Sequence, residues 1–125
     1  NFATGKPPFG ILIARADGGV AQSGWIYGCL TERFCVAHSG QGAFVDGQQI
    51  AARATGEPVA VAAISLLFMD MVKCAAVMDQ IAPHYRLVDV PYCAAEQYPR
   101  LGLGTNDVSL FVDGVPVNLP TQAHG

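Results

Sequence analysis

The side chains that could bind a metal or act as nucleophiles are spread along this 125-residue chain and do not gather into a recognisable site. There are ten acids, three histidines and four cysteines. Asp17, Asp46 and Asp113 each precede a glycine, as turn-forming residues do. The histidines lack metal-ligand spacing, and no two cysteines form a C-x-x-C pair. We therefore expect no catalytic residue set and no metal site formed by this chain alone.

Other acids have simple structural interpretations. Asp70, Asp79 and Glu96 fall in predicted helices, where they would be solvated or cap the helix. Asp89 alternates with apolar residues in a predicted strand and could be a buried polar group. None of these positions needs a bound metal to account for it.

Cys93 is the one cysteine that could be read as a nucleophile. Nucleophilic cysteines need a nearby base or a helix N-terminus that lowers the thiol pKa. No histidine is close to Cys93 in sequence, so His38 or His84 would have to approach it in the fold. Apart from Lys73 beside Cys74, the neighbours of the four cysteines are apolar, which favours buried free thiols in a reducing compartment over disulfides.

Composition narrows the class of protein. The chain is 51% hydrophobic and 14% charged, which excludes a disordered chain. Its net charge is -3 and it has no basic cluster, which disfavours nucleic acid or an anionic membrane as a partner. The longest apolar run, 59–69, is too short to span a bilayer, and no signal peptide is visible. We expect a cytoplasmic location. Because the chain starts with Asn1 and not Met, we expect a processed protein or a fragment.

The first third of the chain predicts an antiparallel β-meander. Asp17-Gly18-Gly19 and Asp46-Gly47 are strong hairpin signals because glycine accepts a positive φ. The strands predicted around these turns are 9–16, 20–27, 34–38, 43–45 and 48–50.

The remainder predicts an α/β unit. Residues 59–68 form a continuous apolar run typical of a fully buried strand, and 69–82 favour a helix that Pro83 ends. Strands follow at 85–90 and 108–111, and 93–103 is ambiguous because Pro99 would break a helix there. We divide the chain into a β-meander (1–56), an α/β part (57–111) and a C-terminal tail (112–125).

Several motifs then resemble one family. Residues 5–14, 24–27 and 34–47 follow one another as in the stretch of inositol monophosphatases after the D-P-[IL]-D-G-T motif, and Asn1-Phe2 resembles the end of D-G-T-x-N-F. The sequence at 93–97 resembles the G-S-A-A segment of that family, and 104–107 resembles the G-x-x-D after it. The resemblance extends from Asn1 to about Phe111. Its most specific part, 40–47, shapes a turn and a hairpin and carries no chemistry.

The resemblance implies a fold and an activity. The family fold is a layered α/β/α/β/α sandwich, so we expect a mixed α/β, incomplete inositol-monophosphatase-like fold. The implied activity is Mg²⁺-dependent hydrolysis of small phosphate monoesters, such as inositol phosphate or a related sugar or polyol phosphate. Mg²⁺ would bind carboxylates and phosphate oxygens and activate a water.

The metal ligands of the family are missing from this chain. The resemblance implies a fixed set of ligands. This set consists of an upstream Glu, the two Asp of D-P-x-D-G-T and the Asp of a later W-D motif. Trp25, the single tryptophan, is followed by Ile26, and residues 113–116 resemble a segment from the C-terminal end of the family. We therefore expect that a stretch between Phe111 and Val112 is absent, that no Mg²⁺ binds and that the chain is inactive alone.

Substrate-side residues carry over more directly. Tyr92, Cys93 and Ala94 occupy the G-S-A positions, and Asp107 matches a position near the substrate pocket. Tyr for Gly and Cys for Ser suggest a different or broader substrate, although the segment could also be a plain helix start. The alternative to a phosphatase fragment is a non-catalytic domain for association or ligand binding. Without the preceding helices, one face of the antiparallel sheet should be bare, which favours a homo-oligomer.

Overall fold

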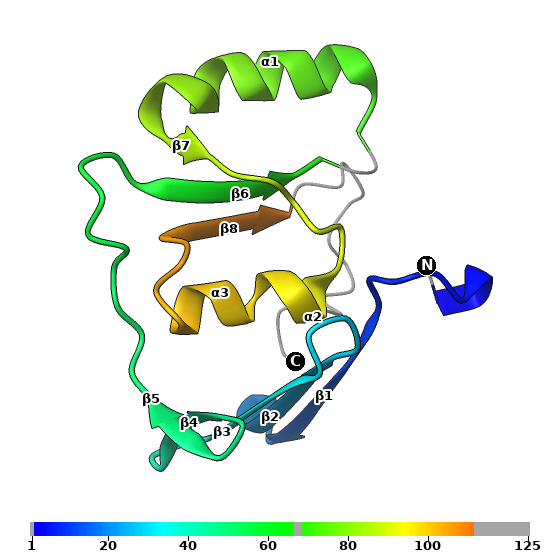
Figure 1. The fold of residues 1–125 in the computed structure, drawn as a ribbon, viewed down its shortest axis with the longest axis vertical. Helices are drawn as coiled ribbons and strands as arrows, with labels where there is room; N and C mark the ends of the chain where they lie inside the picture. Colours follow the sequence, from blue (N-terminus) through cyan, green and yellow to red (C-terminus); the bar gives the residue numbers. More distant parts are fainter. Residues whose placement is uncertain (1, 67–68, 112–125) are drawn as a thin grey trace.

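The computed structural model describes residues 2–66 and 69–111, which form two β-sheets with helices beside them (Figure 1). The strands are β1 (Gly10–Asp17), β2 (Val20–Gly28), β3 (Arg33–His38), β4 (Gly42–Val45), β5 (Gln48–Ile50), β6 (Val61–Ser65), β7 (Arg86–Leu87) and β8 (Val108–Phe111). The helices are α1 (Met71–Ile81), α2 (Ala94–Gln97) and α3 (Pro99–Gly102), with the single 3-10 turns η1 (Phe2–Thr4) and η2 (Ala82–His84). The predicted tail, 112–125, lies outside the described residues.

The described elements stack in four layers. The first five strands form an antiparallel sheet in the order β1-β2-β3-β4-β5, and the other three form a parallel sheet in the order β7-β6-β8. Helices α2 and α3 lie between the two sheets, and α1 lies on the far side of the parallel sheet (Figure 1). The layer order is α/β/α/β, one helical layer fewer than the complete sandwich that the resemblance implies.

The residues of two tight turns determine where the hairpins of the antiparallel sheet form. The β1–β2 turn consists of Gly18 and Gly19 at φ of 56° and 79°, and the β4–β5 turn consists of Asp46 and Gly47 at 49° and 81°. Two successive positive φ values match the twist of the flanking strands, which is why glycine and aspartate occupy such hairpins. Each of the five predicted strands is confirmed to within one residue at either end.

The outer face of this sheet is apolar, and no described segment of the chain covers it. Ile11 and Ile13 of β1 pair with Tyr27 and Trp25 of β2, and Tyr27 pairs in turn with Phe34 of β3. Paired residues share a face, so these side chains form one surface. Ile11, Ile13 and Phe34 are 55%, 54% and 44% exposed. The prediction of a bare face is confirmed for the described part of the chain, and no described helix covers it (Figure 1).

The inner face of the same sheet is in contact with α2. A Cβ added to Gly10 would overlap the Ala95 side chain, and one added to Gly28 would overlap Glu96. Glycine inside a strand often marks such a close approach of another segment. The helix layer can therefore sit directly on the β1–β2 backbone.

Strand β6 is the centre of the second core. Val61, Ala62 and Ala63 are at most 1% exposed, and β6 has a parallel partner on each edge. The predicted central buried strand is confirmed, but it is shorter than the apolar run. Val59 precedes it and is 48% exposed, whereas 67–68 lie outside the described residues.

Helix α1 begins two residues after the predicted start, with Asp70 as its N-cap. The Asp70 carboxylate accepts a hydrogen bond from the Lys73 N–H at 2.9 Å, which satisfies one of the free donors of the first turn. The helix ends at Ile81, and Pro83 lies in the η2 turn that follows. The half-buried residues of α1 recur at helical spacing and form one stripe: Cys74, Val77, Met78 and Ile81.

Two expectations for residues 85–103 need correction. Strand β7 has only two residues instead of the predicted 85–90, because the chain leaves the sheet and the Asp89 carbonyl accepts a hydrogen bond from Arg100. The Asp89 side chain is consequently exposed and not buried. The ambiguous segment resolves into two short helices, since Pro99 is the first residue of α3, where its missing N–H costs no hydrogen bond.

Candidate functional site

A cleft of about 640 Å³ lies between the start of β1 and the segment that leads into α2. Residues 7–10 and Leu12 form one wall, and 91–95 form the other. Tyr92 and Cys93 are the only lining residues with polar side-chain atoms. The structure therefore brings the predicted substrate-side residues Tyr92, Cys93 and Ala94 together with the chain that closely follows Asn1.

Tyr92 has an unusual backbone conformation. Its φ is +52°, in the left-handed region that costs a residue with a Cβ about 1–2 kcal/mol and costs glycine little. Its side chain is 59% exposed, so burial of the ring does not offset the strain. This is the position at which the resembling G-S-A-A motif carries glycine. The backbone thus keeps a glycine-like geometry although the side chain differs.

Cys93 precedes α2 and supports it through its backbone. Its carbonyl accepts hydrogen bonds from the N–H groups of Glu96 and Gln97 at 3.1 and 3.0 Å. The thiol is free and half-buried, as are the other three cysteines, so the expectation of free thiols is met but that of full burial is not.

Neither candidate histidine lines the cleft that contains Cys93. His38 Nδ1 lies 2.9 Å from Ser23 Oγ, on the outer face of the antiparallel sheet. His84 belongs to η2, after α1. Among the residues that line the cleft there is accordingly no base to activate the thiol.

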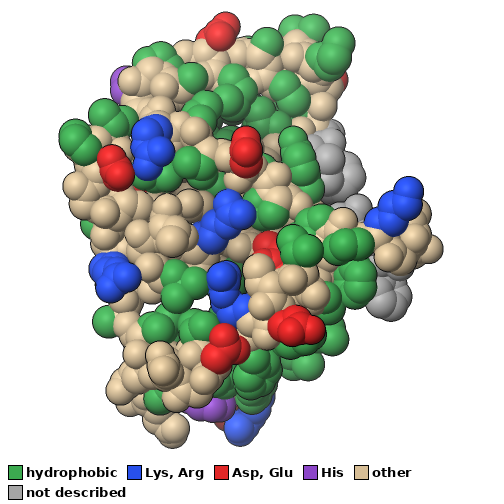
Figure 2. Space-filling model, in the orientation of Figure 1, with side chains coloured by type: hydrophobic (Ala, Val, Ile, Leu, Met, Phe, Trp, Pro, Cys, Tyr) green, Lys and Arg blue, Asp and Glu red, His purple; other side chains and the backbone are tan. Residues whose placement is uncertain are grey.

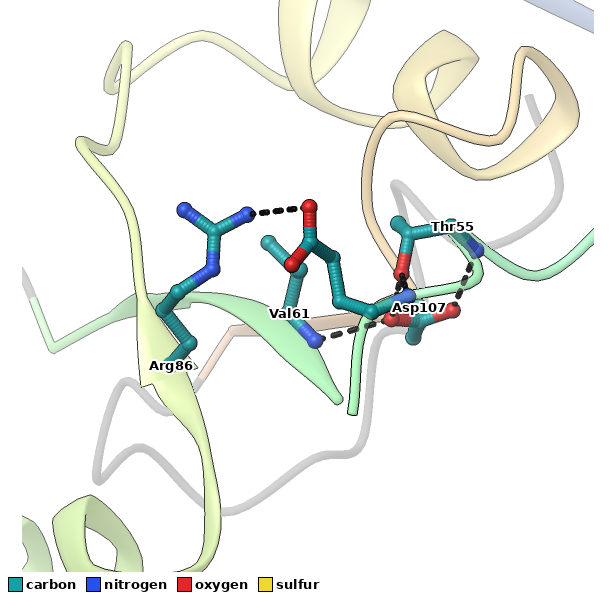
Figure 3. A network of polar contacts seen from close by, with 5 residues as sticks. Thr55, Val61, Arg86 and Asp107 are labelled. Atoms are coloured by element: carbon teal, nitrogen blue, oxygen red, sulfur yellow. Dashed lines mark hydrogen bonds and ion pairs between the residues drawn. The ribbon is translucent and has the colours of Figure 1, made fainter. Parts of the chain in front are cut away.

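Asp107 lies at the start of β8 and does not line the cleft. Its carboxylate accepts hydrogen bonds from the Thr55 hydroxyl at 2.6 Å, the Thr55 N–H at 2.8 Å and the Val61 N–H at 2.8 Å (Figure 3). The Thr55 hydroxyl, then the N–H groups of Val61 and Thr55, hold the pKa of the Asp107 carboxyl below its usual range. We call this arrangement the Asp107 staple, because it ties the connection between the two sheets to the second one.

An ion pair lies close to the Asp107 staple. Arg86 Nη2 is 3.5 Å from Glu57 Oε1, and Glu57 is two residues beyond Thr55 (Figure 3). Both side chains are about half exposed, so water screens the pair and its contribution to stability is small. The staple, and not this pair, fixes the connection.

Helix α2 carries two buried polar residues that the sequence did not reveal. Glu96 is 4% exposed and accepts hydrogen bonds from the Thr31 hydroxyl, the shorter at 3.0 Å. Gln97 is fully buried, and its Nε2 donates to the Ala63 carbonyl at 3.2 Å. The expectation of a solvated or capping Glu96 is wrong, because a four-residue helix enclosed between two sheets has no solvent face for it. Gly28, inside a strand, was the one signal of this close approach.

The described residues do not fit a metal site. Within 2–66 and 69–111, no three His, Cys, Asp or Glu side chains converge as metal ligands would. The carboxylates of Glu96 and Asp107 already accept hydrogen bonds, from Thr31 in the first case and from Thr55 and Val61 in the second. No step that uses a metal can be derived from these side chains. No helix in this part of the chain is long and apolar enough to cross a membrane.

In a comparison with known protein families, the model of the inositol monophosphatase family matches residues 1–80, which are more than half of the chain. The chain belongs to the inositol monophosphatase family. The match covers the meander, β6 and most of α1, so it includes the motifs at 5–14 and 34–47. The segment with Tyr92, Cys93 and Ala94 lies beyond it. No curated protein matches the sequence.

Solved structures extend the family's fold beyond residue 80. Mycobacterium tuberculosis SuhB is 21% identical with a TM-score of 0.73 over 90% of this chain and 48% of its own. Thermotoga maritima IMPase is 17% identical with a TM-score of 0.63, over 78% of this chain and 37% of its own. Inositol monophosphatase II from Staphylococcus aureus is 16% identical with a TM-score of 0.65, over 78% and 38%. At these identities the likeness shows the fold, and this chain spans less than half of each protein.

Proposed function

We propose that this chain is part of a metal-dependent phosphomonoesterase, to which it supplies scaffold and one side of the substrate pocket. One observation carries the proposal: the cleft holds Tyr92, Cys93 and Ala94 against residues 7–10, a few residues after Asn1-Phe2. By the resemblance above, the carboxylates of D-P-x-D-G-T would immediately precede that point. They would then reach the same cleft from outside this chain.

The substrates we propose are small phosphorylated polyols or sugars, including inositol phosphate. Tyr92 and Cys93 replace the glycine and serine of the resembling motif, so contacts to the substrate would differ from the usual ones. Ala94 and the backbone of this segment would contribute shape. We assign Asp107 a supporting part, since its carboxylate is occupied by Thr55 and Val61.

We also propose that Mg²⁺ acts in the complete protein and that this chain does not bind it alone. In a phosphomonoesterase the ion would activate a water and neutralise the leaving oxygen. The support is that the described acids serve in turns, caps and the staple instead of converging. Residues 1–56 and 57–111 would then be parts of the two halves of the family fold. The complete protein would be cytoplasmic, where its thiols stay reduced.

A non-catalytic role in association is the second candidate. The outer face of the antiparallel sheet favours it, with Ile11, Ile13 and Phe34 exposed together. A homo-oligomer formed through that face would need no catalytic residue from this chain. A phosphatase requires the D-P-x-D-G-T motif upstream of Asn1, whereas an association domain does not.

An activity assay separates them. We expect the isolated chain to hydrolyse neither inositol phosphate nor p-nitrophenyl phosphate above background in Mg²⁺. If the upstream reading frame encodes D-P-x-D-G-T, the extended protein should hydrolyse one of them, and EDTA should abolish that activity. Turnover by the 125-residue chain that EDTA removes would refute the missing-ligand argument. A natural start codon immediately upstream of Asn1, in place of that motif, would favour association.

A further inference from the structure

A second cleft, of about 380 Å³, involves α2 and α3. It is separate from the cleft lined by Tyr92, Cys93 and Ala94, which we call the substrate cleft because of the function proposed for it. Arg33 of β3 and Arg100 of α3 line it, together with Thr31, Glu96 and Asn106. We call it the arginine cleft. No residue of the substrate cleft lines it. Figure 2 shows basic side chains with acidic ones beside them near the middle of this face of the molecule.

The charges in the arginine cleft are incompletely paired. The ion pairs of the described residues are Lys73 with Asp70 and Arg86 with Glu57, so neither Arg33 nor Arg100 has a carboxylate within 4.0 Å. Arg100 Nη1 donates to the Asp89 carbonyl at 3.1 Å, and the rest of its guanidinium has no described partner. The residues that line the cleft include two arginines and one carboxylate, a formal excess of one positive charge among them.

Asn106 adds a second and independent observation. It is 3% exposed, it lines the arginine cleft, and its Nδ2 has no hydrogen-bond partner among the described residues. A buried donor without an acceptor is costly, and such groups commonly indicate a ligand or water. The missing partner is an acceptor, as an oxyanion would be.

Glu96 restricts which anion can enter. Its buried carboxylate accepts hydrogen bonds from Thr31 and would repel an anion that has no hydrogen to donate. Inorganic phosphate keeps a hydrogen at neutral pH and can donate it to a carboxylate. Sulfate has no such hydrogen. The cleft thus combines donors for charged oxygens with one acceptor for an O–H group.

We propose that the arginine cleft binds inorganic phosphate, with Arg33 and Arg100 at the charged oxygens and Glu96 accepting the hydrogen of the phosphate O–H. On binding, the Asn106 side chain turns so that its Nδ2, which is inaccessible to solvent in this structure, donates to a further phosphate oxygen. The site is distinct from the substrate cleft, and the proposal does not rest on the chain being part of a phosphatase.

Equilibrium dialysis of radiolabelled phosphate at pH 7 tests the site, because it measures bound ligand whatever the association state of the chain. Arg33→Gln and Arg100→Gln should each weaken phosphate binding at least about tenfold, since each removes charge-assisted hydrogen bonds. Arg15→Gln, an equal loss of charge at an exposed position of β1, should change it by less than about twofold. If all three variants bind phosphate as the wild type does, there is no such site.

Sulfate tests the part played by Glu96. At matched ionic strength the wild type should bind sulfate at least about tenfold more weakly than phosphate, because the carboxylate receives no hydrogen bond from it. Glu96→Gln keeps an acceptor for Thr31 and gains an N–H donor, so it should bind sulfate and phosphate about equally. Equal binding of the two anions by the wild type overturns the proposal. Should Glu96→Gln fail to fold, the two arginine variants, altered at half-exposed positions, still decide it.

Discussion

The two sheets of this molecule bury apolar residues to different degrees. In the parallel sheet, β6 has a strand on each edge and helices on both sides, and Ala62 and Ala63 are inaccessible. In the antiparallel sheet, the larger Ile11 and Ile13 are more than half exposed. Parallel strands need crossover connections, and these bring covering helices with them, whereas a meander of hairpins brings none. Among the described residues, the connections between the parallel strands supply helices that cover their own sheet, and the hairpins of the meander supply none.

A charge placed in the closed core should have the largest effect. Ala62→Asp puts a carboxylate at a fully buried position without a partner, and should cost about 4 kcal/mol or more of the free energy of unfolding. Urea denaturation followed by circular dichroism would measure it. Ala52→Asp, at an exposed position before β6, should change stability by less than about 0.5 kcal/mol. A wild-type midpoint for Ala62→Asp would contradict the closed core.

The same charge on the outer face should change association instead of stability. We expect the wild-type chain to sediment as an oligomer at micromolar concentration, because the exposed apolar face associates. Ile13→Asp should shift it to a monomer and cost less than about 1 kcal/mol of stability.

Val72→Asp is the matched control for that shift, since Val72 is 81% exposed on α1, away from the outer face. It should leave the sedimentation profile unchanged. A wild type that sediments as one sharp monomer and unfolds cooperatively would show that the chain needs no cover for its sheet.

The Asp107 staple offers an intermediate effect and a pH dependence. Asp107→Asn replaces one acceptor oxygen by a donor group that faces the donors of Thr55 and Val61, and should lower the melting temperature by on the order of 5 °C. In the wild type the lowered folded-state pKa of Asp107 stabilises the fold above the unfolded-state pKa of about 3.9. That stabilisation is lost as pH falls through the folded-state pKa.

Melting curves between neutral and strongly acidic pH would test this dependence. Asp107→Asn should lack the part of the acid destabilisation that comes from the staple. Asp79→Asn, at an exposed position on α1, should follow the wild-type curve. Identical acid profiles for Asp107→Asn and the wild type would exclude the staple as a source of stability.

The smallest effect is expected at Tyr92, in the segment that leads from β7 into α2. Tyr92→Gly should leave stability equal to or up to about 1 kcal/mol above the wild type, because glycine adopts a positive φ without strain. Tyr92→Val should lose about 1 kcal/mol, since a β-branched residue tolerates that conformation poorly. Chemical denaturation of both variants would measure the difference. A glycine variant less stable than the valine variant would show that φ at this position is not strained.

Much of the antiparallel sheet was predictable because local signals determine it. Asp17-Gly18-Gly19 and Asp46-Gly47 fix two turns, and apolar strands of suitable length flank them. The family resemblance, carried by residues 5–14 and 34–47, was predictable from the same region and is confirmed. Each of these signals lies within a few residues of the feature that it predicts.

Less of the second region was predictable, because contacts distant in sequence determine it. Thr55 and Asp107 are 52 residues apart, and Thr31 and Glu96 are 65 apart. Neither the staple nor the burial of Glu96 leaves a local pattern. The cleft shows the same limit: the type of Tyr92 gives no sign of its positive φ, and only the resemblance to a glycine motif hinted at it.

Gly10 and Gly28 have a consequence for the chain while it is being synthesised. Because they have no side chains, they leave room on the inner face of the meander, and α2 occupies it. Glu96 of α2 comes 65 residues after its hydrogen-bond partner Thr31. At about 5–20 residues per second, the ribosome needs roughly 3–13 s to make that stretch. Through this interval the nascent meander lacks the cover that α2 gives to its inner face. Until α2 is made, chaperones that bind exposed apolar strands have access to that inner face.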